Sequence, residues 1–241
     1  MNRKTQTQII RKVKYFFYAF GIHRILPGKS LNFLGHLSQL SKWISKNKDL
    51  KYSDFPSSTF DYGRRFDLYQ FLLAQEIPSN EGIDYLEFGV AAGVSFKWWV
   101  KNNTHPDSKF YGFDTFTGLP EDWGPFKKGD MSNGNEPPQV NDDRAAFFQG
   151  VFQTTLYPFL ETFNSKKKKV IHLDADLYSS TLFVLTTLSP YLKKGDILLF
   201  DEFNVPLHEY KAFKEWSESF YIKYTVLGQV NNYYQIALQI D

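Results

Sequence analysis

The chain has 241 residues, of which 42% are hydrophobic and 18% aromatic; this composition is typical of an ordered domain with an appendage and excludes a disordered or low-complexity protein. Because the chain contains no cysteine, thiolate catalysis, cysteine zinc sites, iron–sulfur clusters and disulfide frameworks are excluded, and we expect a reducing, cytoplasmic setting. The charge is uneven: residues 1–50 hold ten basic residues and one acid, so they carry +9 and leave −7 on the rest of a +2 chain.

Residues 1–55 are predicted to form a basic helical extension, and residues 56–241 the main domain. Apolar residues recur on one helical stripe at Ile9, Val13, Phe16 and Phe20, and a second stripe predicts a helix over residues 31–46. Two interpretations stay open. Either the stripes pack against the main domain or a second subunit, or the segment attaches reversibly to an anionic membrane surface as a peripheral contact.

Short apolar runs alternate with helical patterns from residue 83 onward. We expect strands at residues 83–90, 109–114, 145–148, 170–174 and 196–201, and helices near 93–102, 154–163, 179–192 and 207–219. This alternation predicts an α/β fold with a doubly wound, mostly parallel sheet. Residues 221–227 and 233–240 are expected to form an antiparallel hairpin at one edge, which brings the sheet to seven strands.

One segment, residues 118–138, is rich in glycine and proline and follows the end of a predicted strand. Its four glycines and four prolines exclude a continuous helix. A segment of this length without regular structure is usually a lid, a binding loop or disorder. Because ligands of such sheets bind beyond the strand ends, we expect a mobile lid here rather than a passive surface loop.

Acidic residues stand at the carboxyl ends of four predicted strands. They are Glu87, Asp114, the pair Asp174 and Asp176, and the pair Asp201 and Glu202. Clustered carboxylates repel one another unless a cation or ligand hydroxyls compensate, so the cluster predicts a site rather than a set of helix caps. By contrast, His172, within the strand before Asp174, is expected to be a hydrogen-bonded interior histidine.

The first of these acids begins an E-x-G-x-x-x-G turn, Glu87 to Gly93, at a strand-to-helix junction. Its glycines let the backbone pass close to a ligand and direct amide groups toward it. The turn is not the dinucleotide motif, which needs glycine at position 87, and it is not a P-loop. Asp114, at the end of the next strand, stands where a carboxylate would hold a ribose diol. Together the two features indicate a ligand of the nucleoside type.

Over residues 60–220 the chain resembles the class I S-adenosylmethionine-dependent methyltransferases, and among them the macrocin O-methyltransferase (TylF-like) family that modifies sugars of natural products. The resemblance rests on Tyr85 to Gly89 with Gly93, on Gly112 to Pro120, on Gly150 to Phe152 with Thr155 and Leu156, on Leu173 to Thr181, and on Asp201 to Phe203. It implies a Rossmann-like methyltransferase fold. The chain departs from the family in having Asp201-Glu202 where many members have Asp-Asp, and a Gly/Pro-rich segment where they have a helix.

The resemblance also implies roles for individual residues. The donor S-adenosylmethionine is expected at Glu87, Gly89, Ala91, Gly93, Asp114, Thr115, Gln149 and Gly150, with the glycine turn at the methionine portion, Asp114 at the ribose and Gln149-Gly150 near the adenine. A divalent ion, usually Mg²⁺, is expected at Asp174, Asp201 and Glu202, and Asp174 and Asp176 are the expected catalytic residues, with Asp176 as the base. Oxygen ligands independently favour Mg²⁺ over zinc in a chain without cysteine.

The sequence thus predicts a metal-assisted O-methyltransferase that acts on a hydroxyl of a sugar or glycosylated small molecule. The enzyme alternative is a glycosyltransferase, because Asp174-Ala175-Asp176 also matches an Asp-x-Asp pair for a metal and a nucleotide-sugar. A non-catalytic module that docks through its basic helix is a third class. We expect no nucleic-acid partner, because the acidic main domain carries no zinc-finger, RNP or basic-helix motif.

Overall fold

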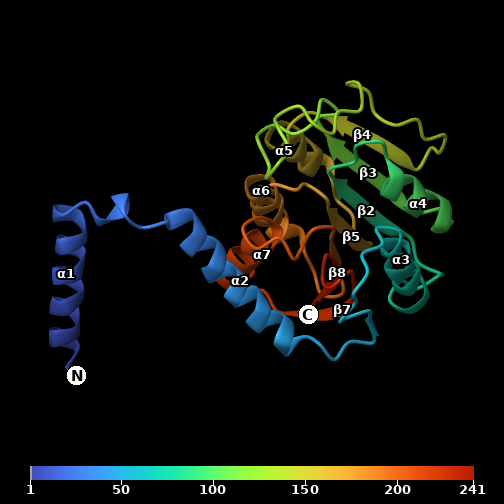
Figure 1. The fold of residues 1–241 in the computed structure, drawn as a ribbon. Coiled ribbons are helices and arrows are strands. Elements are labelled where there is room, and N and C mark those ends of the chain that lie inside the picture. The colour runs from blue at the N-terminus through green and yellow to red at the C-terminus, as the bar shows by residue number, and fades with distance from the viewer. Residues whose placement is uncertain (1) are drawn as a thin grey trace.

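The computed structural model describes residues 2–241, and its central feature is a sheet with helices on both faces (Figure 1). The strands are β1 (Tyr52–Ser53), β2 (Ile83–Phe88), β3 (Lys109–Asp114), β4 (Ala145–Gln149), β5 (Lys168–Leu173), β6 (Ile197–Phe200), β7 (Tyr224–Val230) and β8 (Gln235–Ile240). The α-helices are α1 (Arg3–Ala19), α2 (Gly28–Lys46), α3 (Arg64–Gln75), α4 (Val94–Asn102), α5 (Phe152–Thr162), α6 (Tyr178–Leu188) and α7 (Glu209–Ser219). Two short 3₁₀ helices are η1 (Ile22–Arg24) and η2 (Ser189–Tyr191).

The strand order is β1-β7-β8-β6-β5-β2-β3-β4. Strands β2 to β6 are parallel to one another, β8 is antiparallel to β6, and β7 is antiparallel to β8. The predicted α/β fold, with a mostly parallel sheet and an antiparallel C-terminal hairpin, is therefore confirmed. The sheet has eight strands rather than the seven expected, because the two-residue strand β1 pairs in parallel with β7.

The direction of winding changes at β2. The chain runs outward from β2 to β3 and β4, and then returns to place β5 on the other side of β2. The connection after β2 therefore runs toward one edge of the sheet and the connection after β5 toward the other edge. A crevice opens between β2 and β5 at their carboxyl ends. This topology is what brings the acids at the ends of β2, β3, β5 and β6 to one edge of the sheet.

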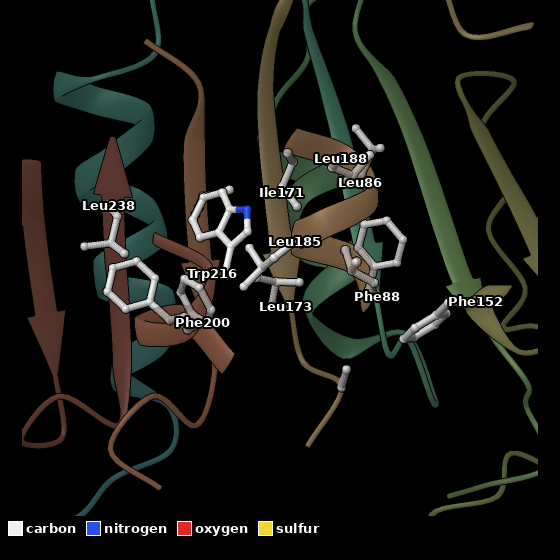
Figure 2. Packing of buried hydrophobic residues seen from close by; sticks show 14 of the residues in the cluster. Leu86, Phe88, Phe152, Ile171, Leu173, Leu185, Leu188, Phe200, Trp216 and Leu238 are labelled. Carbon is white, nitrogen blue, oxygen red and sulfur yellow. The ribbon is translucent and has the colours of Figure 1, made fainter. Parts of the chain in front are cut away.

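The core lies on both faces of the sheet because the buried strands carry apolar residues at successive positions. Leu86, Phe88, Ile171 and Leu173 face helices α5, α6 and α7, where Trp216 completes the packing (Figure 2). The intervening positions face α3 and α4 and pack against Leu68, Leu72, Phe96 and Trp99. Because β2 and β5 are buried on both faces, their ends are held rigidly where the chemistry is expected.

The N-terminal extension contacts this body through the second half of α2 and through β1, which pairs with β7. Leu40 is buried against the core, and the Trp43 indole donates to the Tyr224 hydroxyl at 2.8 Å. Helix α1 has no buried residue and stands apart from the sheet (Figure 1). The division of the chain at residue 55 stays a prediction. Among the residues described, no helix combines the length and apolarity needed to cross a membrane.

Candidate active site

A cavity of about 490 Å³ lies at the carboxyl ends of β2, β3 and β5. Of the predicted site residues, the cavity is lined by Glu87, Gly89, Ala91, Asp114, Thr115, Asp174, Asp176 and Glu202. Its lining does not include Gly93, Gln149, Gly150 or Asp201; beyond β4 it is formed by Val151, Phe152 and Gln153. The position of the cavity follows from the winding of the sheet, since the switch point between β2 and β5 is where open α/β sheets bind ligands.

The glycine turn after β2 passes unusually close to the end of β5. Gly89 has a φ of +96°, and a Cβ added there would lie 1.8 Å from the carbonyl oxygen of Asp174. Gly93, with a φ of +74°, precedes α4, and a Cβ there would lie 2.7 Å from the Pro138 side chain. Both positions therefore need glycine. The glycines in the E-x-G-x-x-x-G pattern serve a close backbone approach that any larger residue would block.

Asp114 holds this turn in place. Its Oδ2 accepts hydrogen bonds from the amides of Val90 at 2.8 Å and Ala91 at 2.7 Å, and its Oδ1 accepts one from Phe116 at 2.7 Å. Oδ1 also accepts from the Thr115 hydroxyl at 3.4 Å, so protein donors face all of the about four acceptor positions of an ionised carboxylate. The side chain was expected to be available to a ribose, whereas here its main contacts are with the backbone. Its ribose role stays a prediction.

Glu87 is buried, with 1% of its surface exposed, and belongs to a polar chain within the core. Its Oε2 accepts a hydrogen bond from the Tyr85 hydroxyl at 2.5 Å. The same hydroxyl lies 2.8 Å from Nδ1 of His172. The other imidazole nitrogen is 3.3 Å from the Tyr69 hydroxyl. His172 is therefore the interior, hydrogen-bonded histidine that the sequence predicts. Burial raises the pKa of Tyr69 and of Tyr85 well above the ordinary value, so both hydroxyls stay protonated. The Tyr85 hydroxyl can then fix Glu87 at the cavity wall.

The acids beyond β5 and β6 form two groups, and the first contains Asp174 and Asp201. Burial, followed by the charge of Asp201, raises the pKa of Asp174 well above the usual range. The Tyr62 hydroxyl donates to Oδ2 of Asp201, while Nη1 of Arg65 lies 3.9 Å from Oδ1. At that distance Arg65 supplies charge but no hydrogen bond, and Oδ1 of Asp201 is a buried acceptor without a donor.

The second group contains Asp176 and Glu202. Asp176 has a φ of +58°, a left-handed conformation that is uncommon for a residue with a side chain and that is found at functional sites. Burial and the neighbouring Asp176 carboxylate raise the pKa of Glu202. Its Oε1 accepts from the Tyr234 hydroxyl at 2.6 Å, while its Oε2 is buried without a partner. Behind it, burial raises the pKa of Glu209 well above normal.

These acids fit a divalent cation with oxygen ligands. Oδ1 of Asp201 and Oε2 of Glu202 are both buried acceptors that no protein donor satisfies. A ligand atom from each of His172, Asp174 and Asp201 lies within 4.8 Å of the others. Of the predicted set, the structure places Asp174 and Asp201 in this group, together with His172, and Glu202 outside it. The role of Glu202 as a metal ligand stays a prediction. Such uncompensated carboxylates are stable only if they share protons or bind a cation.

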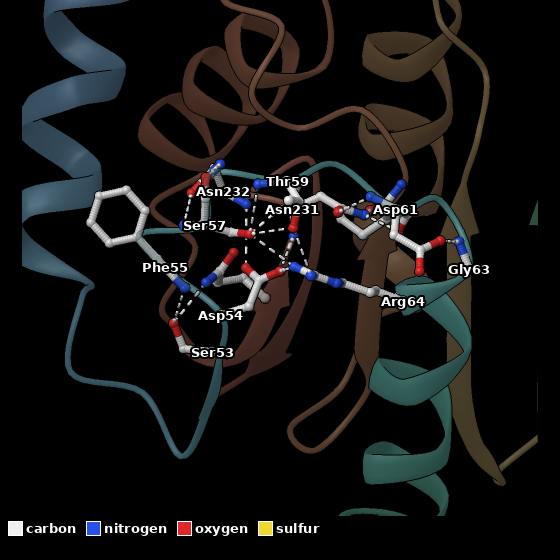
Figure 3. Close-up of polar contacts among 12 residues, drawn as sticks. Ser53, Asp54, Phe55, Ser57, Thr59, Asp61, Gly63, Arg64, Asn231 and Asn232 are labelled. Carbon is white, nitrogen blue, oxygen red and sulfur yellow. Dashed lines mark hydrogen bonds and ion pairs between the residues drawn. The ribbon is translucent and has the colours of Figure 1, made fainter.

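Tyr62 and Arg65 line the cavity but were not predicted from the sequence. Tyr62 lies in the segment between β1 and α3, which is bound to the β7–β8 turn (Figure 3), and Arg65 lies in the first turn of α3. Arg64 forms an ion pair of 2.7 Å with Asp54, which also accepts from the amide of Asn231 at 2.9 Å. No local pattern marks these residues, because their partners lie in the last part of the chain.

The Gly/Pro-rich segment forms one wall of the cavity through Gly118, Leu119, Pro120, Glu121 and Met131. It is folded on itself: the amide of Leu119 donates to the carbonyl of Asp130 at 2.9 Å, and Trp123 stacks on Phe126 at 5.1 Å between ring centroids. Glu121 accepts from the Ser179 hydroxyl at 2.6 Å, across the cavity mouth. The segment lies beside the ligand site as predicted, and its movement as a lid stays a prediction.

Comparison with known proteins provides independent information. Residues 86–203 match the model of a family described as a methyltransferase domain. The fold is similar to that of CalS11, a calicheamicin methyltransferase, with 20% identity over 89% of this chain and 93% of that one and a TM-score of 0.57. It is also similar to the O-methyltransferase NovP, with 17% identity, 87% and 98% coverage and a TM-score of 0.59. A search of curated proteins finds no match.

The structural matches confirm the Rossmann-like fold, and the family match supports the enzyme class that the sequence predicts. The structural similarity by itself shows only the fold, because the identities are low. The family match adds that the acids of β2, β3, β5 and β6 lie within a methyltransferase domain, since residues 86–203 include the ends of all four strands. The macrocin O-methyltransferase family remains a prediction.

Proposed function

We propose that this chain, an S-adenosylmethionine-dependent methyltransferase, transfers the donor methyl group to a hydroxyl of a sugar or glycosylated small molecule with the help of Mg²⁺. The observation that carries the proposal is the set of buried, uncompensated carboxylates beside the glycine turn in one cavity. The neighbours agree with it: an apo structure of CalS11 is described as a TDP-rhamnose 3'-O-methyltransferase, and a further neighbour, with a TM-score of 0.50, as cmcI-D160 Mg-SAM.

On the donor side, the protein supplies a preformed turn and a rigid wall. The close approach of Gly89 to the end of β5 leaves the turn no room to move inward, and Asp114 fixes two of its amides. Glu87 adds a buried carboxylate that can accept hydrogen bonds and balance a positive charge. Thr115 and the segment after β4 complete the lining. These residues fit a nucleoside linked to a cationic amino-acid portion.

On the acceptor side, Asp174, Asp201 and Glu202 would hold Mg²⁺. When both are bound, S-adenosylmethionine supplies an electrophilic methyl group, and Mg²⁺ lowers the pKa of the acceptor hydroxyl. Asp176 takes the hydroxyl proton as the new oxygen–carbon bond forms and the sulfur–methyl bond breaks, which leaves S-adenosylhomocysteine. The Tyr62 hydroxyl orients Asp201 by donating to its Oδ2, and the Arg65 charge lies near its Oδ1.

Ligand-dependent stability tests the proposal. S-adenosylhomocysteine at about 100 times its dissociation constant should add roughly 2.7 kcal/mol, which raises the melting temperature by roughly 5–10 °C for a chain of this size. UDP-sugars and NAD, each with Mg²⁺ or chelator, are measured in parallel. A response to UDP-sugar alone would replace the proposal with the glycosyltransferase alternative.

The metal site is tested with Asp174→Asn. We expect turnover to lose its Mg²⁺ dependence and fall steeply, while S-adenosylhomocysteine still raises the melting temperature. The variant should fold, because the neutral amide removes a charge that burial already disfavours. Asp49→Asn, at an exposed position outside the cavity, is the matched control. Turnover that stays Mg²⁺-dependent, with donor affinity lost instead, would overturn the assignment.

A further inference from the structure

We propose that the N-terminal arm, defined as residues 2–37, binds the surface of an anionic lipid bilayer. The sequence leaves three partners open for its two apolar stripes, namely the main domain, a second subunit and a membrane. The structure addresses the first of these directly, because helix α1 has no buried residue and stands away from the body (Figure 1). The apolar face of the arm therefore lacks a cover within its own chain.

The exposed apolar surface of the arm is large and continuous along the sequence. In α1 and at its C-cap the large aliphatic and phenylalanine side chains are Ile9, Ile10, Val13, Phe16, Phe17 and Phe20, which are 38–68% exposed. At 100° per residue these positions fall within an arc of about 120° on the helix surface. The apolar face continues after α1 through Ile25, Leu26, Leu31, Phe33, Leu34 and Leu37, all exposed. Soluble proteins seldom leave so many neighbouring apolar side chains in water unless they bind something.

The charge of the arm identifies the partner. The arm contains no acidic residue and seven basic ones: Arg3, Lys4, Arg11, Lys12, Lys14, Arg24 and Lys29. In α1 the basic side chains border the apolar arc or lie opposite it. An occupant must therefore be apolar along its centre and anionic on both sides. A bilayer with anionic headgroups has this arrangement over its whole surface.

A second copy of the arm fits poorly. Pairing two α1 helices through their apolar arcs would bring the basic borders of one helix against those of the other, with no acid in either arm to balance them. A bilayer imposes no such repulsion, since every basic residue near an anionic surface strengthens binding. The aromatic content, with Phe16, Phe17 and Phe20 in the last turn of α1 and its cap, also suits an amphipathic helix lying at the boundary of headgroups and acyl chains.

The test uses the full chain and sedimentation with phosphatidylcholine vesicles that contain or lack phosphatidylglycerol. We expect binding to the anionic vesicles only, weakened by salt. The variant Arg11→Gln, Lys12→Gln, Lys14→Gln should lower the partition coefficient about 100-fold, from the usual contribution of each basic residue. The matched control, Lys101→Gln, Lys194→Gln, Lys223→Gln, removes three exposed charges from the body and should leave it unchanged.

The apolar face is tested separately with Phe16→Ser and Phe20→Ser. Because α1 is not buried against the body, this double variant should keep the wild-type melting temperature while losing vesicle binding. Equal sedimentation of the wild-type chain with neutral and anionic vesicles would overturn the proposal. So would a dimer in light scattering that dissociates in the double variant while vesicle binding is absent in both, since the partner would then be a second copy.

Discussion

The close approach between the glycine turn and the end of β5 can be tested by adding a single methyl group. In Gly89→Ala the new Cβ would lie 1.8 Å from the Asp174 carbonyl oxygen and 2.6 Å from its carbonyl carbon. Ordinary contact begins at 3.4 Å, so the two backbones must separate by about 1.6 Å. Neither can move freely, because Asp114 holds the turn and Asp174 follows a strand paired on both sides.

Two costs add in this variant. A side chain at a φ of +96° costs about 1–2 kcal/mol in backbone strain, and overpacking in a closely packed site costs about 1–3 kcal/mol or more. Gly195→Ala is the matched control, because Gly195 has a φ of +91° but no atom within 4 Å of its added Cβ. Gly195→Ala should therefore lose only the backbone-strain cost of about 1–2 kcal/mol. The difference between the two variants, about 1–3 kcal/mol, therefore measures the close approach itself.

Urea unfolding of both variants, analysed at a common m-value, gives the two losses of stability. Donor binding and turnover provide the second measurement, since displacement of the Val90 and Ala91 amides should lower kcat/KM about 100-fold in Gly89→Ala and leave Gly195→Ala unaffected. Equal losses of stability in the two variants, or full activity in Gly89→Ala, would refute the argument that the turn is wedged against β5.

Two further predictions concern buried charges. Burial and the Asp176 carboxylate raise the pKa of Glu202, so the folded chain keeps a proton that the unfolded chain releases near pH 4.3. Without divalent cations, the free energy of unfolding should therefore fall as the pH rises above this value, by at most about 1.4 kcal/mol per pH unit. Unfolding measured from pH 5 to pH 8 should show a flatter profile for Glu202→Gln, and parallel profiles would contradict the raised pKa. Asp196 accepts from Nζ of Lys169 at 3.0 Å and from the amides of Lys169 and Lys193, with both partners of the ion pair buried. Asp196→Ala should cost about 3–5 kcal/mol by leaving the Lys169 charge unpaired, and a loss below 1 kcal/mol in urea unfolding would show that the charge reaches water.

The sheet could be predicted because its signal is local. Apolar runs bounded by turns mark β2, β3, β5 and β6, and parallel strands place their carboxyl ends at one edge, so the positions of Glu87, Asp114, Asp174 and Asp201 followed from the sequence alone. Strand β1 could not be predicted, because two residues carry no periodic pattern. It forms because it pairs with β7 and because the adjacent Asp54 accepts from the amide of Asn231, contacts that exist only once the C-terminal hairpin has folded.

The site shows the same division between local and distant causes. A tyrosine 139 residues before Asp201 donates to it, and no spacing rule connects the two. Asp114 was predicted to face a ligand, but whether its oxygens meet amides or a ribose depends on how closely the turn after β2 approaches β3. Gln149 likewise donates to Asn135 at 2.9 Å, within the Gly/Pro-rich region, rather than lining the cavity.

The amino-acid order alone determined the class of fold, the edge of the sheet at which the acids gather, the need for glycine after β2, and the basic, amphipathic character of the first helix. These depend on residue type and on spacings of a few positions, which act wherever the segment lies. Tertiary structure decided which carboxylates share a charge, which of their oxygens lack a donor, and which apolar face stays in water. Those properties depend on distance and burial, and both are set by contacts between segments far apart in the chain.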